Sequence, residues 1–409
     1  MTIAIFTITS ALHDETAINE ATSQFLGTLN FSYDFKGSDF STYGEADLNL
    51  IYVRTGGTEA IFRKIQPMLM EKSSRPFYLL TSGKSNSLAA SMEILSYLNL
   101  NKLRGEIIHG DTPYINSRVN ELAQVECAVK KLQGMRLGVI GKPSDWLISS
   151  SAQPAAIKSK LGISLIDISI DEVLDEFKAI PEADKHSEEL LEKAPTKAIK
   201  DATAGAVQLY HTLKNVVRRH NLNGFTIRCF DMLSVLHNTS CYALARLNAE
   251  GIVAGCEGDI PAMLSMAITQ AVAGVSGFQA NPSRINPETG EMLVAHCTIP
   301  LNMVSRYELD THFESGIGIG IRGYMPEGPV TIFKVSGDLA RHFTAEATLE
   351  RNQAEPNLCR TQQVLRLANP EQASYFLTAP IGNHHIIVPG HLAAIFHAIL
   401  SSAGTVLND

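Results

Sequence analysis

The chain has 409 residues, and at about 150 residues per domain this length suggests two to three domains. Hydrophobic residues make up 45% of the chain and charged residues 19%, which is usual for a globular protein and excludes a disordered chain. The net charge of −8 provides no attraction to phosphate backbones, so we do not expect nucleic acid as a partner.

Neither a targeting segment nor a membrane span is expected. The first residues lack the basic region and the cleavage site of a signal peptide, and no stretch approaches about 18 apolar residues without a charge. The six cysteines are few for this length and none forms a CxxC pair. These features predict a reduced, cytoplasmic protein with no membrane partner.

Short apolar runs alternate with helical patterns over residues 1–134. The runs at 2–8, 48–53, 77–80 and 106–109 predict strands. They are apolar throughout rather than alternating, which indicates burial on both faces of a sheet. The alternation of strands and helices predicts an N-terminal α/β domain built on a doubly wound parallel sheet.

The same pattern restarts after Gly134, so residues 135–300 are predicted to form a second doubly wound α/β domain. Its expected strands lie at 136–140, 163–170, 225–230 and 252–256, and its expected helices at 195–219, 234–249 and 260–273. The segment 170–200 is rich in lysine and glutamate, and we expect it to form an exposed helical excursion.

Residues 301–409 differ in pattern, because alternating runs are separated by turn residues such as those at 326–328 and 336–338. This pattern is typical of antiparallel strands and predicts a small β-domain or barrel, followed by a terminal helix at 391–402. The predicted fold class is therefore α/β, with two doubly wound parallel-sheet domains followed by a small antiparallel β-domain.

Acidic and glycine residues follow the predicted strand at 252–256, in the sequence Gly255-Cys-Glu-Gly-Asp259. In α/β folds, ligands bind at the carboxyl ends of parallel strands, which makes a carboxylate pair there a candidate site. Aspartate is also a common helix N-cap. We therefore favour a capping role for Asp259 and keep Glu257 as the functional candidate.

Histidines follow two further predicted strands. His296 stands at the end of an apolar run, and His384 and His385 follow a glycine at 382. Imidazole is a common ligand of divalent metals, and carboxylate together with imidazole suits Mn²⁺. Each histidine alone is more simply explained as a hydrogen-bonded core residue, but the three motifs together favour a metal site.

Two other features have a simple structural explanation beside a functional one. Arg54 opens a glycine turn after the predicted strand at 48–53, where it either belongs to the turn or reaches a cleft. Trp146 is the only tryptophan, and it either packs in the core or stacks on a sugar.

The order of these motifs resembles the L-fucose and L-arabinose isomerase superfamily. The resemblance implies two α/β domains and a C-terminal β-domain, in homo-oligomers such as trimers or hexamers with active sites at subunit contacts. It further implies interconversion of aldoses and ketoses, with a small-molecule sugar as substrate and Mn²⁺ or another divalent metal as cofactor. By this similarity Glu257 matches the first acidic metal ligand, His384 or His385 the later histidine, and His296 a histidine at or beside the metal.

The sequence departs from the superfamily at its second metal carboxylate, since Asn281 stands close to that position. Asparagine adds no negative charge and cannot act as a general base. Isomerisation moves a proton between neighbouring carbons through an enediol, which needs a carboxylate base and a second acid. Glu257 is the expected base, and Asp231 or Asp259 is the expected replacement acid. The alternative is a non-catalytic carbohydrate-binding or regulatory homologue that has lost the second carboxylate.

Overall fold

The computed structural model describes residues 1–180, 185–403 and 406–407. The chain divides into two compact units, Met1–Lys130 and Lys131–Asp409. Within the described residues, no helix combines the length and the apolar character that crossing a membrane requires.

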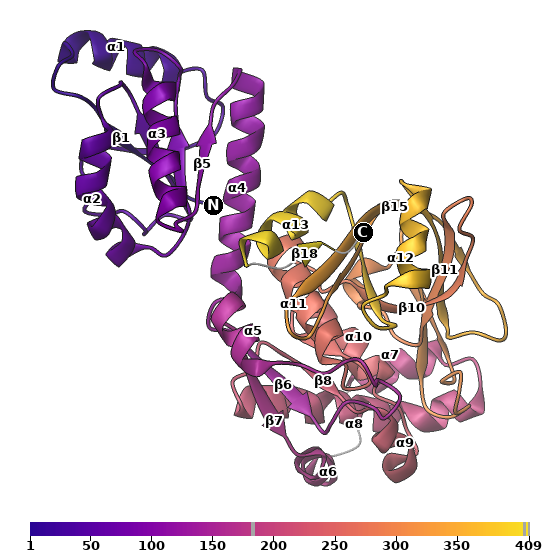
Figure 1. Cartoon of the computed structure of the whole chain (residues 1–409). Coiled ribbons are helices and arrows are strands. Elements are labelled where there is room, and N and C mark those ends of the chain that lie inside the picture. The colour runs from indigo at the N-terminus through magenta and orange to yellow at the C-terminus, as the bar shows by residue number, and fades with distance from the viewer. Residues whose placement is uncertain (181–184, 404–405, 408–409) are drawn as a thin grey trace. The chain divides into compact units, whose positions relative to one another are not determined.

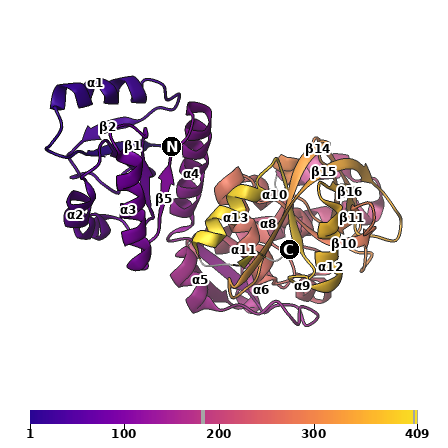
Figure 2. The same ribbon diagram turned by 45° about the horizontal axis from the view of Figure 1, so that its top comes forward.

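The first unit is a doubly wound parallel sheet with the strand order β2-β1-β3-β4-β5. Helices α1 and α4 pack on one face of the sheet and α2 and α3 on the other, as Figure 2 shows. The strands are β1 (Ile3–Ile8), β2 (Asp34–Gly37), β3 (Leu48–Val53), β4 (Phe77–Leu80) and β5 (Gly105–Ile108). The helices are α1 (Glu15–Leu26), α2 (Glu59–Lys72), α3 (Ser87–Leu100) and α4 (Thr112–Leu132).

The second unit contains another parallel sheet, with the strand order β7-β6-β8-β9. These strands are β6 (Arg136–Ile140), β7 (Ser164–Ile168), β8 (Gly224–Ile227) and β9 (Val253–Gly255). The helices of this region are α5 (Pro154–Leu161), α6 (Ile170–Ala179), α7 (Lys185–Lys193), α8 (Lys197–Arg219), α9 (Phe230–Leu236), α10 (Cys241–Ala249) and α11 (Ile260–Ala273). The helix expected at 234–249 is thus two helices, with a break at residues 237–240. The charged segment expected to be helical forms α6 and α7, and residues 181–184 between them lie outside the described residues.

Six antiparallel strands of the second unit close into a barrel, because β14 pairs with both β17 and β15 at the two ends of the order β14-β17-β10-β11-β16-β15. The strands are β10 (Phe278–Ile285), β11 (Glu291–His296), β14 (Gly328–Val335), β15 (Arg341–Gln353), β16 (Thr361–Leu367) and β17 (His385–Pro389), with β18 (Val406–Leu407) on the edge of β15. A separate hairpin joins β12 (Arg306–Asp310) to β13 (Gly320–Tyr324), and helices α12 (Ala373–Thr378) and α13 (Ala393–Ser402) complete the chain.

The predicted fold class, parallel α/β sheets followed by an antiparallel β-region, is confirmed. Helix α11 lies between the second parallel sheet and the barrel and contacts both (Figure 1). One continuous apolar core runs through both layers and includes Phe225 of β8, Phe278 of β10 and Ile332 of β14. The strands β10 and β11 precede residue 300, yet they pair with β17 and β16. The predicted division into domains at 134 and 300 stays a prediction.

Candidate metal centre and active site

Glu257 lies just beyond β9, at the carboxyl end of the second parallel sheet. Its backbone φ of +64° is in the left-handed region, which is unfavourable for residues other than glycine. Two backbone hydrogen bonds hold the turn in place: the N–H of Ser144 donates to the carbonyl of Glu257 (2.9 Å), and the N–H of Gly258 donates to the carbonyl of Ile227 (2.9 Å). Strain of this kind persists where the surroundings fix the backbone, as at functional sites.

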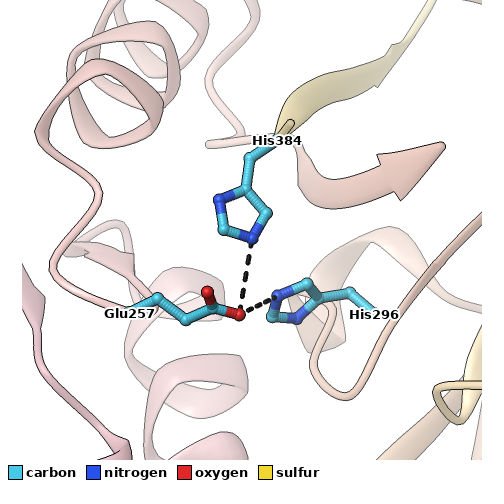
Figure 3. A group of neighbouring side chains, drawn as sticks. All are labelled: Glu257, His296 and His384. Carbon is cyan, nitrogen blue, oxygen red and sulfur yellow. Dashed lines mark ion pairs between the residues drawn. The ribbon is translucent and has the colours of Figure 1, made fainter. Parts of the chain in front are cut away.

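Two histidines of the barrel region meet this carboxylate. His296 is the last residue of β11, and His384 directly precedes β17. The Nε2 atoms of both rings lie 3.5 Å from Oε1 of Glu257, as Figure 3 shows. One ligand atom from each of the three buried side chains lies within 4.8 Å of the other two. His296 and His384 stand 39 and 127 positions after Glu257 in the chain, and the fold brings them together with it.

The chemistry of this group fits a divalent cation. One carboxylate and two imidazoles are the donors expected for Mn²⁺ or a similar ion. Burial favours the neutral form of Glu257, but the contacts with His296 and His384 outweigh burial and hold its pKa well below its usual range. Within the described residues, Nε2 of His384 is buried without a hydrogen-bond partner. A buried ring nitrogen in that state is costly, and a cation bound to the neutral ring would remove this cost.

A buried pair of opposite charges, Asp259 and Lys334, lies behind His384. Its Nδ1 is 2.8 Å from Oδ2 of Asp259, and Nζ of Lys334 on β14 is 3.6 Å from the same oxygen. All three side chains are almost completely buried. The other oxygen of Asp259 accepts the N–H of Ala262 (2.8 Å), which is the predicted helix cap of α11. A carboxylate behind a ligating histidine fixes its tautomer and strengthens it as a donor.

Burial lowers the pKa of His384, but Asp259 and Glu257 outweigh burial and raise this pKa to about 9. The pKa of Asp259 falls to about 2, because Lys334 and His384 outweigh the opposing effect of burial. Without a cation, the imidazole of His384 is therefore protonated, and it lies between the carboxylates of Asp259 and Glu257. Sequence reasoning missed Lys334, although a lysine inside the apolar run of residues 330–335 was a visible anomaly.

His385 faces the opposite way from His384, because neighbouring residues of an extended segment point to opposite sides. Its Nε2 lies 3.0 Å from the hydroxyl of Tyr375, and burial lowers its pKa to about 3. Asp231 lies near the start of α9, where its carboxylate pairs with Nε of Arg228 (3.0 Å). Neither side chain belongs to the group formed by Glu257, His296 and His384.

The residues predicted to bind substrate are divided between the two units. Nε1 of Trp146 donates to Oε2 of Glu257 (2.7 Å), and Trp146 is 51% exposed, so it is not a core residue. Asn281 accepts a hydrogen bond from the side-chain amide of Asn383 (2.9 Å). Arg54 is in the first unit and donates to the side chain of Asn19 (2.6 Å).

A small pocket, with a cavity volume of about 40 Å³, adjoins the three-residue group. Glu257, His296 and Asn281 line it, together with Phe230 and Glu314. Glu314 is the second carboxylate among the described residues that line this pocket, and sequence reasoning missed it because it lies in a loop outside any motif. The remaining lining residues include five of the six cysteines, namely Cys229, Cys241, Cys256, Cys297 and Cys359.

No family model matches the sequence. The chain is 25% identical to sulfoquinovose isomerases of Priestia aryabhattai and Priestia megaterium over 237 residues, which is 55% of this chain and 53% of each relative. It is also 25% identical over 234 residues to the sulfoquinovose isomerase of Alkalicoccus urumqiensis. The chain thus spans about half the length of the curated relatives it matches.

The predicted resemblance is confirmed at this level, since relatives found independently of the motifs are also sugar isomerases by name. Over about half of its length the chain is thus similar to proteins named sulfoquinovose isomerase, in line with the predicted resemblance.

Proposed function

We propose that the protein is a metal-dependent sugar isomerase that interconverts an aldose and a ketose. The observation that carries this proposal is the convergence of Glu257, His296 and His384 beside a pocket that Asn281 and Glu314 also line. The similarity to sulfoquinovose isomerases supports the same class of reaction. Glu257, His296 and His384 would hold the cation, and Mn²⁺ is the proposed ion. A divalent cation would polarise neighbouring carbonyl and hydroxyl oxygens of a sugar and so acidify the proton that is moved.

The chain supplies the groups that move this proton. We assign Glu257 and Glu314 as the carboxylate pair, because both line the pocket. One removes the proton from the carbon beside the carbonyl to give an enediol, and the other supports its return to the neighbouring carbon. Asp259 is completely buried behind His384, so we assign it to positioning that ring rather than to contact with sugar.

Trp146 and Asn281 are the proposed substrate-binding residues. Trp146 is half-exposed, which suits stacking of its indole on the apolar face of a sugar ring. Its Nε1–H also fixes the orientation of the Glu257 carboxylate through a 2.7 Å hydrogen bond. Asn281 contributes a neutral amide to the pocket, where it can bond a sugar hydroxyl.

The direct test is a substrate panel with the purified protein and added Mn²⁺. We expect interconversion of at least one aldose among fucose, arabinose, xylose and sulfonated hexoses, and loss of this activity after chelation of the metal. Heat-treated protein is the matched control. No turnover of any of these sugars by metal-loaded protein would contradict the proposal.

A second candidate function is a non-catalytic carbohydrate-binding homologue. Asn281 favours it, because the three-residue group contains one carboxylate and the amide adds no second charge. Calorimetry with the same sugars separates the two functions: binding without metal and without turnover supports this candidate. The predicted homo-oligomer and the cytoplasmic location stay predictions.

A further inference from the structure

Two cysteines of the pocket, Cys229 and Cys256, have their sulfur atoms in direct contact. Sγ of Cys229 lies 3.0 Å from Sγ of Cys256, and the two side chains are almost fully buried. A disulfide needs about 2.05 Å between the sulfurs, so a shift of about 1 Å would join them. Cys229 follows β8 and Cys256 follows β9, so the pair links neighbouring strands at the carboxyl edge of the parallel sheet.

We propose that Cys229 and Cys256 form a reversible disulfide when the protein meets a peroxide. One thiol attacks the peroxide O–O bond and gives a sulfenic acid and water or alcohol. The second thiol then attacks this sulfur, which forms the S–S bond and releases water. Two thiol hydrogens and two electrons leave the pair, and the peroxide is the species that is reduced. A dithiol reductant reverses the reaction by exchange.

The two cysteines differ in how firmly hydrogen bonds fix their backbone. The backbone of Cys256 is fixed by Gln279, which accepts its N–H (2.9 Å) and donates to its carbonyl (3.3 Å). The carbonyl also accepts the hydroxyl of Thr226 (3.4 Å). Cys229 instead lies at the start of α9, a helix of 7 residues without a side-chain cap. Closing the bond should therefore move Cys229 and the first turn of α9 more than it moves Cys256.

This movement would reach the pocket through Phe230, the first residue of α9. Its ring packs edge-on against Trp146 (4.8 Å between centroids) and against His312 (5.6 Å). Trp146 in turn donates to Glu257, the residue next to Cys256. Oxidation of the pair would thus displace one wall of the pocket and disturb the carboxylate that we assign to the metal. A displacement of about 1 Å in such a site can lower turnover by up to about 100-fold.

The chemical test uses the full chain and hydrogen peroxide. After treatment, remaining thiols are alkylated, the protein is digested and cross-linked peptides are identified by mass spectrometry. We expect one cross-link, between Cys229 and Cys256, with the loss of two hydrogen atoms and full reversal by dithiothreitol. Cys127→Ser, which changes a cysteine of the first unit, should behave as the wild type. A cross-link between other cysteines, such as Cys297 and Cys359, or the absence of any cross-link would overturn the proposal.

The functional consequence rests on the proposed isomerase activity, whereas the cross-link does not, so the two can fail separately. If a sugar is turned over, oxidised wild-type protein should lose activity by about tenfold or more and recover it with dithiothreitol. Cys229→Ser and Cys229→Ala should show no such reversible loss, whatever their starting activity. Equal activity of the fully cross-linked and the reduced protein would contradict the switch.

Discussion

Replacing Glu257 by glutamine is expected to abolish sugar isomerisation and to weaken divalent metal binding by more than about 100-fold. Glutamine keeps the size of the side chain but removes the negative charge that lies 3.5 Å from Nε2 of both His296 and His384. Even partners behind a ligand change metal affinity by about 10- to 100-fold, so loss of a ligand charge should exceed that range. Elemental analysis and calorimetry with Mn²⁺ measure the effect directly.

Glu314→Gln is the matched control for this experiment. It removes a carboxylate from the same pocket, but Glu314 is not part of the group that the three ligand atoms form. We expect this variant to keep the wild-type metal content while losing turnover, because Glu314 is assigned to proton transfer alone. If Glu257→Gln retained wild-type metal content, the metal would be held by other residues.

Replacing Asp259 by alanine is expected to destabilise the metal-free protein by about 3 to 5 kcal/mol. The substitution leaves the cation of Lys334 buried without its carboxylate, and it removes the hydrogen bond that caps α11. It also leaves Nδ1 of His384 without its partner. Urea unfolding, followed by circular dichroism, gives the change in the free energy of unfolding.

A double variant separates the cost of leaving the Lys334 charge unpaired from the cost of the lost hydrogen bonds of Asp259. Asp259→Ala/Lys334→Met removes both members of the buried pair, so it should be more stable than Asp259→Ala alone, although it has two substitutions. Lys334→Met alone should cost less than Asp259→Ala, because Asp259 keeps its bonds to His384 and to the N–H of Ala262. Strictly additive losses in this cycle would show that the pair is not energetically coupled.

The fold was largely predictable because each kind of sheet has its own pattern of apolar residues in the sequence. Strands β3 and β4 are buried on both faces and are therefore apolar at every position except Asn49. The barrel strand β15 instead alternates over part of its length, since one face meets the core. The strand β2 was missed because its four residues are exposed or half-exposed and only Phe35 among them is a large apolar residue. The pairing of β10 and β11 with later strands left no local trace, since it depends on contacts with β17 and β16.

The candidate metal centre was partly predictable for a related reason. Glu257, His296 and His384 each stand at a strand end, where a fold of this class gathers side chains, so residue type and position together were informative. The choice between His384 and His385 depended on which face of the extended segment meets Glu257 and Asp259, and a one-residue shift reverses that choice. Lys334 and Glu314 depend on tertiary contacts alone, and no spacing rule connects them to the site.

The central claim is that Glu257, His296 and His384 bind one divalent cation, and the only tryptophan of the chain allows a direct measurement. The indole of Trp146 is hydrogen-bonded to Glu257 at 2.7 Å, so a paramagnetic ion at the centre should quench its fluorescence. Titration with Mn²⁺ should give saturable quenching at one ion per chain in the wild type and no saturable quenching in Glu257→Gln. Identical titration curves for the two proteins would contradict the account.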